Sequence, residues 1–312
     1  MKWQATLLLA ASASFSTLAL AAEEVQQQVA LDSGSKVDIR VQRGHVTVKS
    51  WDKNQVSING SLDEQSEGLV FEQRGAKFVI EDKLPRKYSG SSDNGSKLEI
   101  YLPKQTDVRV AGTSTDFSLS DISGNIDGNS ISGDIKLSKL AGDIAIRSVS
   151  GGIKAEALNG KLALETVSGD IDDEDSQGSS HYRLVSGDLT ANSQATNVYA
   201  DVVSGKVKLQ LSRVEQLKVH AVSGDIKLAL DSLSDKAQLD SVSGDIKLHF
   251  NDKPNAEFVI NGGPSGKISN KLSDDKPQKA KYTHSESLKF QTGSAKANVY
   301  ITTISGDIQL EH

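Results

Sequence analysis

Residues 222–228 read Val-Ser-Gly-Asp-Ile-Lys-Leu, and residues 242–248 repeat the same seven letters. Shorter copies of this unit recur along the chain, with their glycines nine residues apart at first and 18 to 20 apart later. The glycines of the series are Gly124, Gly133, Gly142, Gly151, Gly160, Gly169, Gly187, Gly205, Gly224, Gly244 and Gly306. Self-similarity at a fixed spacing is typical of repeat proteins, in which neighbouring units stack to bury a shared core.

Aliphatic residues flank each glycine, two positions before it and two positions after it, in all eleven copies. Apolar residues at every second position predict a short strand with one buried face, so we expect both flanking side chains in the core. The glycine itself is expected at a corner, where the backbone needs a conformation that other residues avoid. Two units then make one coil with two strands and two corners. Stacked coils would place Ile226 over Ile246 and Leu228 over Leu248.

The predicted fold is therefore all-β: a single-stranded β-solenoid (a β-helix or β-roll) with about 18–20 residues per coil and irregular β caps at both ends. We expect an N-terminal β capping region over 22–115, regular repeats over 116–250, and C-terminal coils with a cap over 251–312. A polar insertion is expected at 262–288. Residues 22–312 are expected to form one continuous domain.

The first 21 residues are expected to be a signal peptide. Lys2 precedes an apolar stretch, and Ala19-Leu-Ala21 matches a signal-peptidase cleavage site. We therefore expect an exported protein, in the periplasm first, with the cell surface or secretion as alternatives. No later stretch is apolar for long enough to predict a membrane span.

Composition narrows the function classes. The chain has no cysteine, which excludes disulfides and thiolate chemistry. It has 41 acidic and 35 basic residues with no basic block, so nucleic acid is a poor partner. Aromatic residues make up only 5% of the chain, beside 26 glycines, which suits thin aliphatic layers joined by tight turns.

The repeated Val-Ser-Gly-Asp-Ile-Lys-Leu unit resembles that of a bacterial family of exported β-strand-repeat proteins of unknown function, usually labelled "putative adhesin". Leu102-Pro-Lys-Gln, Arg43-Gly-His-Val-Thr-Val, Gly266-Lys-Ile-Ser-Asn and the closing Thr303-Ile-Ser-Gly-Asp-Ile also look like that family. The resemblance implies a β-solenoid at the cell envelope and supplies no catalytic residues.

The aspartates that follow the corner glycines have two interpretations. Repeated Gly-Asp invites comparison with calcium-binding nonapeptides, but those need two further glycines in each repeat. The alternative is that each carboxylate accepts backbone N–H bonds in the turn. We assign the corner motif to Gly133, Asp134, Gly151, Gly169, Asp170, Gly187, Asp188, Gly205, Gly224, Asp225, Gly244, Asp245, Gly306 and Asp307. The outward Lys136, Lys227 and Lys247 are expected to pair with these aspartates across coils, and a charged binding strip is the alternative interpretation.

Calcium candidates occur once, at Asp172, Asp173, Glu174 and Asp175, where oxygen ligands are concentrated. A solvated loop is the other interpretation of this segment. The sequence carries no catalytic or cofactor motif, so no cofactor is expected. We expect a non-catalytic envelope protein that presents a rigid surface to an unknown protein or glycan. The alternatives are a self-associating scaffold or filament and a carbohydrate-active β-helix enzyme.

Overall fold

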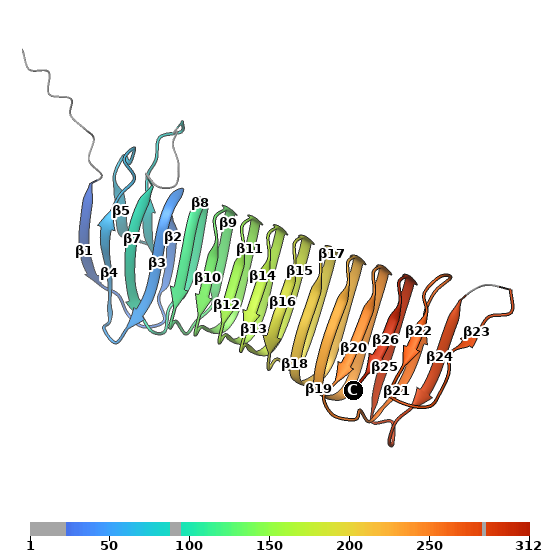
Figure 1. The fold of residues 1–312 in the computed structure, drawn as a ribbon. Helices are drawn as coiled ribbons and strands as arrows, with labels where there is room; N and C mark the ends of the chain where they lie inside the picture. Colours follow the sequence, from blue (N-terminus) through green and yellow to red (C-terminus); the bar gives the residue numbers. More distant parts are fainter. Residues whose placement is uncertain (1–22, 88–94, 283–284) are drawn as a thin grey trace, which may run out of the picture.

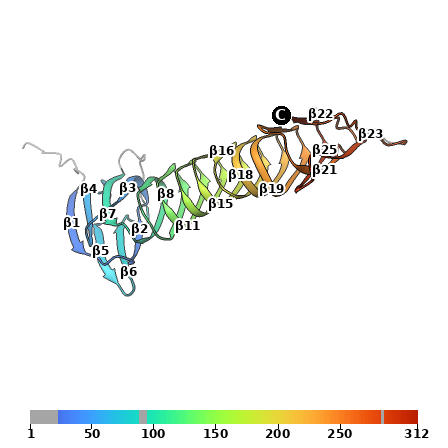
Figure 2. The ribbon, with the colours of Figure 1, turned by 90° about the horizontal axis from the view of Figure 1, so that it is seen from below.

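The computed structural model describes residues 23–87, 95–282 and 285–312. The predicted signal peptide lies outside the described residues. Every regular element in the described part of the chain is a β-strand. Coils stack side by side into an elongated rod (Figures 1 and 2).

The rod has two sheets that share a core. The first sheet runs in hydrogen-bonded order β5 (Leu69–Arg74), β6 (Lys77–Asp82), β2 (Lys36–Arg40), β8 (Asp107–Ser120), β9 (Ile126–Ser132), β11 (Ala141–Ser150), β13 (Asn159–Ser168), β15 (Gln177–Ser186), β17 (Asn197–Ser204), β18 (Val207–Ser223), β19 (Ile226–Ser243), β25 (Ala297–Ser305), β21 (Ala256–Asn261), β24 (Glu286–Gln291) and β23 (Gln278–Lys279).

The second sheet contains the other strand of each coil. Its order is β1 (Glu24–Ala30), β4 (Gln55–Ser61), β7 (Ser96–Pro103), β3 (Arg43–Trp51), β8, β10 (Ile135–Ser138), β12 (Ile153–Glu156), β14 (Ile171–Glu174), β16 (Leu189–Ser193), β18, β19, β20 (Ile246–Phe250), β26 (Ile308–Glu311) and β22 (Ile268–Asn270). Strands β8, β18 and β19 pass round a corner and belong to both sheets.

The register confirms the predicted coil. Ala141 pairs with Asn159, Val198 with Leu217 and Leu217 with Ala237, so each coil takes 18 to 20 residues. The predicted ladders are present, with Ile226 beside Ile246 and Leu228 beside Leu248 in parallel register. These aliphatic ladders form one continuous buried cluster along the rod.

Antiparallel pairs occur near both ends of the described chain. At the N-terminal end they join β1 to β4, β4 to β7 and β5 to β6. At the C-terminal end they join β21 to β24 and β23 to β24. The segment 262–288 is not wholly irregular, because it contains β22, β23 and the start of β24.

We expected the aliphatic residue two positions before each corner glycine to be buried. The structure has two types of corner, and the expectation is wrong for one of them. Ile122, Leu140 and Leu158 are buried as expected. The residues before the other corner glycines are exposed; they are Ile131, Val149, Val167, Val185, Val203, Val222, Val242 and Ile304.

The two corner types differ in the backbone conformation just before the glycine, and this difference decides whether the aliphatic side chain is buried. Three residues before the glycine, the first type has a residue in the left-handed region: Asp121, Lys139, Ala157 or Asp175. That residue breaks the alternation and turns the next side chain inward. In the second type the strand continues to the serine before the glycine, so strict alternation carries the valine or isoleucine outward.

Both corner types need glycine, because neighbouring coils approach closely at each of them. Gly187 has φ of +137°, and a Cβ on it would lie 2.1 Å from the carbonyl oxygen of Gly169 in the preceding coil. The glycines therefore form a stacked column that lets one coil sit directly on the next.

Candidate functional site

The exposed aliphatic residues form a continuous strip that crosses the first sheet near the C-terminal ends of its strands. We call it the valine strip. Its members are Ile131, Val149, Val167, Val185, Val203, Val222, Val242 and Ile304, and they are 38% to 54% exposed. They come from eight consecutive strands of the sheet, from β9 to β25. At a strand spacing of about 4.8 Å the strip is about 34 Å long. Contiguous exposed apolar surface on this scale is typical of interaction sites.

β-branched residues also favour extended backbone, so part of the strip's composition serves the strand itself. Threonine would serve that purpose equally well while remaining compatible with water. The described strip nevertheless carries an aliphatic residue at all eight positions. Strand propensity alone therefore does not account for it.

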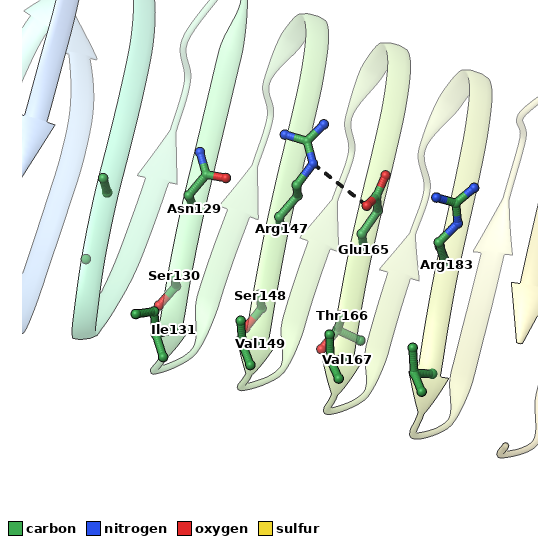
Figure 3. Close-up of a pocket in the computed structure, with 13 residues that line it drawn as sticks. Asn129, Ser130, Ile131, Arg147, Ser148, Val149, Glu165, Thr166, Val167 and Arg183 are labelled. Atoms are coloured by element: carbon green, nitrogen blue, oxygen red, sulfur yellow. Dashed lines mark ion pairs between the residues drawn. The ribbon is translucent and has the colours of Figure 1, made fainter. Parts of the chain in front are cut away.

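A second row of outward side chains lies two residues before the valine strip, and we call it the charged row. It consists of Asn129, Arg147, Glu165, Arg183, Asp201, His220, Asp240 and Thr302, each paired in register with the next. From Arg147 to Asp201 the sign of the charge alternates. Nε of Arg147 lies 3.7 Å from Oε2 of Glu165 (Figure 3). Alternation removes the repulsion that like charges would have on adjacent strands.

The two rows line a groove of about 500 Å³ at the N-terminal end of the strip. Arg147, Glu165 and Arg183 lie on one side, and Val149 and Val167 lie on the other (Figure 3). Ala111 and Gly112 of β8 also line the groove, and these small residues leave space at this end of it. The groove is a shallow channel with an apolar edge and a polar edge, which suits an elongated partner.

The corner aspartates hold neighbouring coils together. Oδ1 of Asp170 accepts a hydrogen bond from the backbone N–H of Asp188 at 2.8 Å, and Oδ1 of Asp188 accepts one from Lys206 at 2.8 Å. Asp134, Asp225, Asp245 and Asp307 accept the equivalent N–H bond. The acceptor was expected to act within its own turn; the donor instead lies one coil further on. Each carboxylate thus links two neighbouring coils by a hydrogen bond.

The expected Asp–Lys pairing across coils is not observed among the described residues. Lys247 forms its ion pair with Glu311, which lies on the neighbouring strand β26 further from the corner. Lys136 and Lys227 have no ion pair in the described part of the chain. One oxygen of each of these aspartates, Oδ1, accepts a backbone N–H bond from the neighbouring coil instead.

The four calcium candidates are not brought together. Asp172 and Glu174 are exposed, and Asp175 occupies a left-handed turn with φ of +57°. Asp173 points into the core and accepts hydrogen bonds from the hydroxyls of Ser176 and Tyr182. Residues 171–174 form β14, so of the four candidates only Asp175 lies in an exposed turn of the kind that the solvated-loop interpretation describes. No cluster of acidic or histidine side chains in the described ranges has the geometry of a metal site.

The buried Asp173 carboxyl shares its environment with a phenol. Burial raises the pKa of Asp173, and the hydrogen bonds from Ser176 and Tyr182 oppose that rise in part. Burial, followed by the nearby Asp173 charge, raises the pKa of Tyr182 well above its usual range. Tyr182 is fully buried, so the pair is a polar element of the core rather than a reactive site.

A second polar cluster, in the N-terminal region, was missed at the sequence level. Nη2 of Arg43 donates to Asp63 at 2.8 Å, and the backbone N–H of Asp63 donates to Asp82 at 3.2 Å. Hydroxyls of Ser66 and Ser96 also donate to Asp82. Burial raises the pKa of Asp82, with these hydroxyl bonds opposing the rise. No motif identifies the cluster, because its members come from β3, β6, β7 and the loop after β4, which only the folded chain brings together.

The position of the cluster indicates a structural role. Arg43 and Asp63 are each 2% exposed and Asp82 is 3% exposed, so no substrate reaches them. The ion pair joins the start of β3 to the loop after β4. It therefore ties the antiparallel strands of the N-terminal end to the first coil.

Comparison with known proteins places the chain in a family. The family model described as "Toastrack DUF4097" matches residues 34–221 and, in a second match, 186–311. A search of curated proteins finds no match.

Solved structures from three bacteria are among those that the chain matches at low sequence identity. A "putative lipid binding protein" from Parabacteroides distasonis is 13% identical over 92% of this chain and 96% of its own, with a TM-score of 0.49. A "putative adhesin" from Bacteroides fragilis is 9% identical over 92% and 97%, with a TM-score of 0.36. A "putative cell adhesion protein" from Clostridium sporogenes is 10% identical over 93% and 99%, with a TM-score of 0.24.

Proposed function

We propose that this chain, which belongs to the Toastrack DUF4097 family, is a non-catalytic interaction protein that binds its partner through the valine strip and the charged row beside it. The observation that carries the proposal is the stack of eight exposed aliphatic side chains on eight consecutive strands. A monomeric protein gains nothing in solubility from such a strip. A binding surface gains apolar area that is already rigid, so little conformational entropy is lost on binding.

The proposed location is the cell envelope. The support is the signal-peptide pattern at 1–21, which lies outside the described residues. In the described part of the chain no helix is long and apolar enough to cross a membrane. The adhesin-like character that we propose for the chain resides in this binding surface.

Non-catalytic binding is supported by the chemistry of the outward positions. The buried carboxyls Asp82 and Asp173, whose pKa values are raised, lie away from solvent. The outward charged side chains instead repeat along the rod. A periodic surface can bind an extended partner at several equivalent points, whereas a catalytic site needs one unique constellation.

Site-specific photo-crosslinking in living cells tests the proposal. One variant carries a photoreactive residue at Val167, in the strip, and the control carries it at Thr190, an exposed position of the second sheet. We expect a defined adduct from position 167 and none from position 190. Equal adducts from both positions would contradict the proposal, as would the absence of an adduct from 167.

A further inference from the structure

The order of residues in the charged row identifies a partner: we propose that the strip and row of one molecule pack face to face against those of a second copy, with the two rods antiparallel. This inference rests on the proposed function and names its partner. The two copies would be related by a twofold axis parallel to the strands that passes between β15 and β17.

The charged row is self-complementary when it is read in reverse. Under this axis Arg183 faces Asp201 of the second copy, Arg147 faces Asp240, and Glu165 faces the ring of His220. The remaining pair, Asn129 with Thr302, is uncharged. The register that defines this order is continuous from β9 to β25. Because a twofold interface uses the same patch on both molecules, each complementary pair occurs twice.

The position of the axis is constrained by charge. An axis that passes through a strand would place like charges opposite one another; through β15, for example, Glu165 would face Asp201. An axis between strands pairs opposite signs, because the row alternates. Among such axes, the one between β15 and β17 places all eight positions of both rows in contact.

The valine strip is compatible with the same axis. Ile131 would face Ile304, Val149 would face Val242, Val167 would face Val222, and Val185 would face Val203. Aliphatic side chains would thus meet only aliphatic side chains, and the exposed strip of each copy would be removed from water.

The two outward rows further from the corner present no like-charge conflict between β11 and β19. Asp143 would face Lys236, and His181 would face Tyr199. Ala163 would leave space opposite the longer Lys218. These residues occupy equivalent register positions of their strands. The complementarity therefore extends across the width of the face.

The available area suits a stable dimer. Eight strands at about 4.8 Å and four outward positions per strand at about 6.7 Å intervals give a face of about 34 by 20 Å. That is about 700 Å² on each copy, near the ~800 Å² per partner of a standard protein–protein interface. This lateral contact differs from the end-to-end stacking that open solenoids would form.

Cysteine crosslinking tests the register, because the natural chain contains no cysteine. Val149→Cys and Val242→Cys lie five strands apart in one molecule, about 24 Å at the usual spacing, so neither variant can bridge to itself in the proposed dimer. Because packed sheets lie about 10 Å apart, beyond the reach of a disulfide, the two variants are joined with a short bifunctional thiol-reactive crosslinker. We expect a covalent heterodimer when the two variants are mixed, and little from either alone. The register control is Val149→Cys mixed with Val203→Cys, which should not bridge.

Charge exchange tests the same interface by sedimentation. The wild-type mature protein should sediment as a dimer. Arg183→Asp would face Asp201 twice and should weaken dimerisation at least about tenfold, the effect of roughly 1.4 kcal/mol. The double variant Arg183→Asp/Asp201→Arg restores opposite charges and should restore the dimer. Lys208→Asp, on the exposed face of the second sheet, is the matched control and should have no effect.

Failure of this inference is distinguishable from failure of the proposed function. A wild-type monomer at all concentrations, or equal crosslinking of each cysteine variant with itself, overturns the antiparallel dimer. If position 167 then still forms a photo-adduct with a different molecule, such as a lipid or another protein, the proposed function stands. If position 167 forms none, both fall.

Discussion

At the scale of single residues, the corner shows that adjacent glycines have different roles. Gly151 has φ of +149°, and a Cβ on it would lie 2.2 Å from the carbonyl oxygen of Gly133. Gly152 has no such backbone requirement, and its nearest neighbours to a Cβ are at 3.6 and 3.7 Å. The first glycine is needed for coil stacking, and the second is replaceable.

We therefore expect Gly151→Ala to destabilise the protein by about 3 kcal/mol or more, since it combines an unfavourable φ with a backbone clash. Gly152→Ala should change the free energy of unfolding by less than about 1 kcal/mol, because alanine only reduces the entropy of the unfolded chain. Urea denaturation of both variants measures the difference. Equal effects would contradict this account of the corner.

The buried Asp173 makes a prediction about pH. Its folded-state pKa is raised above 3.8, so the folded state binds the proton more tightly than the unfolded state does. The stability that the protonated group contributes is present at pH values below 3.8 and is lost as pH rises through the raised pKa. Relative to the non-titrating Asp173→Asn, the wild type should therefore lose stability as pH rises across this window.

Each unit of pKa elevation corresponds to about 1.4 kcal/mol of this change. Denaturation across pH measures it, with Asp172→Asn as the matched control at an exposed position of the same strand. A difference between wild type and Asp173→Asn that stays constant with pH would show that Asp173 is not buried as described.

At the scale of strands, alternation places side chains of similar chemistry in opposite environments. On β13, Leu164 is fully buried while Val167 is 48% exposed. Glu165, between them in sequence, belongs to the charged row. Two adjacent outward rows on one strand thus combine apolar and charged surface without disturbing the core.

Val167→Thr should therefore change stability by less than about 0.5 kcal/mol, because threonine keeps the β-branched shape at an exposed site. Leu164→Thr should cost about 2–5 kcal/mol, since it leaves a cavity and buries a hydroxyl. Thermal unfolding compares the two substitutions in the Arg183→Asp background, so that loss of the proposed dimer contact does not contribute to the result. A large loss for Val167→Thr would indicate that the strip supports the fold rather than a partner.

At the scale of the whole molecule, each coil contacts chiefly the coils on either side of it. Leu209 of β18 pairs with Ala191 of β16 and with Leu228 of β19. Stability in such an array is approximately a sum of coil terms and nearest-neighbour terms, so damage is expected to spread only locally.

Leu209→Ala should accordingly increase hydrogen exchange in β16, β18 and β19 while β4 and β7 at the N-terminal end keep wild-type protection. Lys208→Ala, at the exposed neighbouring position, is the control and should leave exchange unchanged. A uniform loss of protection along the rod would show that the solenoid unfolds as a single unit.

The β-solenoid, the coil length and the ladder of Ile226 over Ile246 follow from the residue pattern, because alternation and spacing are local properties that each stacked coil repeats without change. It did not determine which side of each corner is buried. The left-handed residues Lys139 and Ala157 reverse the next side chain, whereas the strand before Gly151 continues and leaves Val149 outside. Backbone conformation at one residue decides this, and the apolar pattern is the same in both cases.

The candidate site, by contrast, depends on how the coils are stacked in three dimensions. The residues of the charged row are 18 to 20 positions apart in sequence, except Thr302, which a long insertion separates from Asp240. Their alternation of charge becomes visible only when the coils are stacked in register. The same holds for the cluster of Arg43, Asp63 and Asp82, which strands distant in sequence bring together. Stacking of the coils places residues that are far apart in sequence next to one another, and this produces the surface that the sequence does not show.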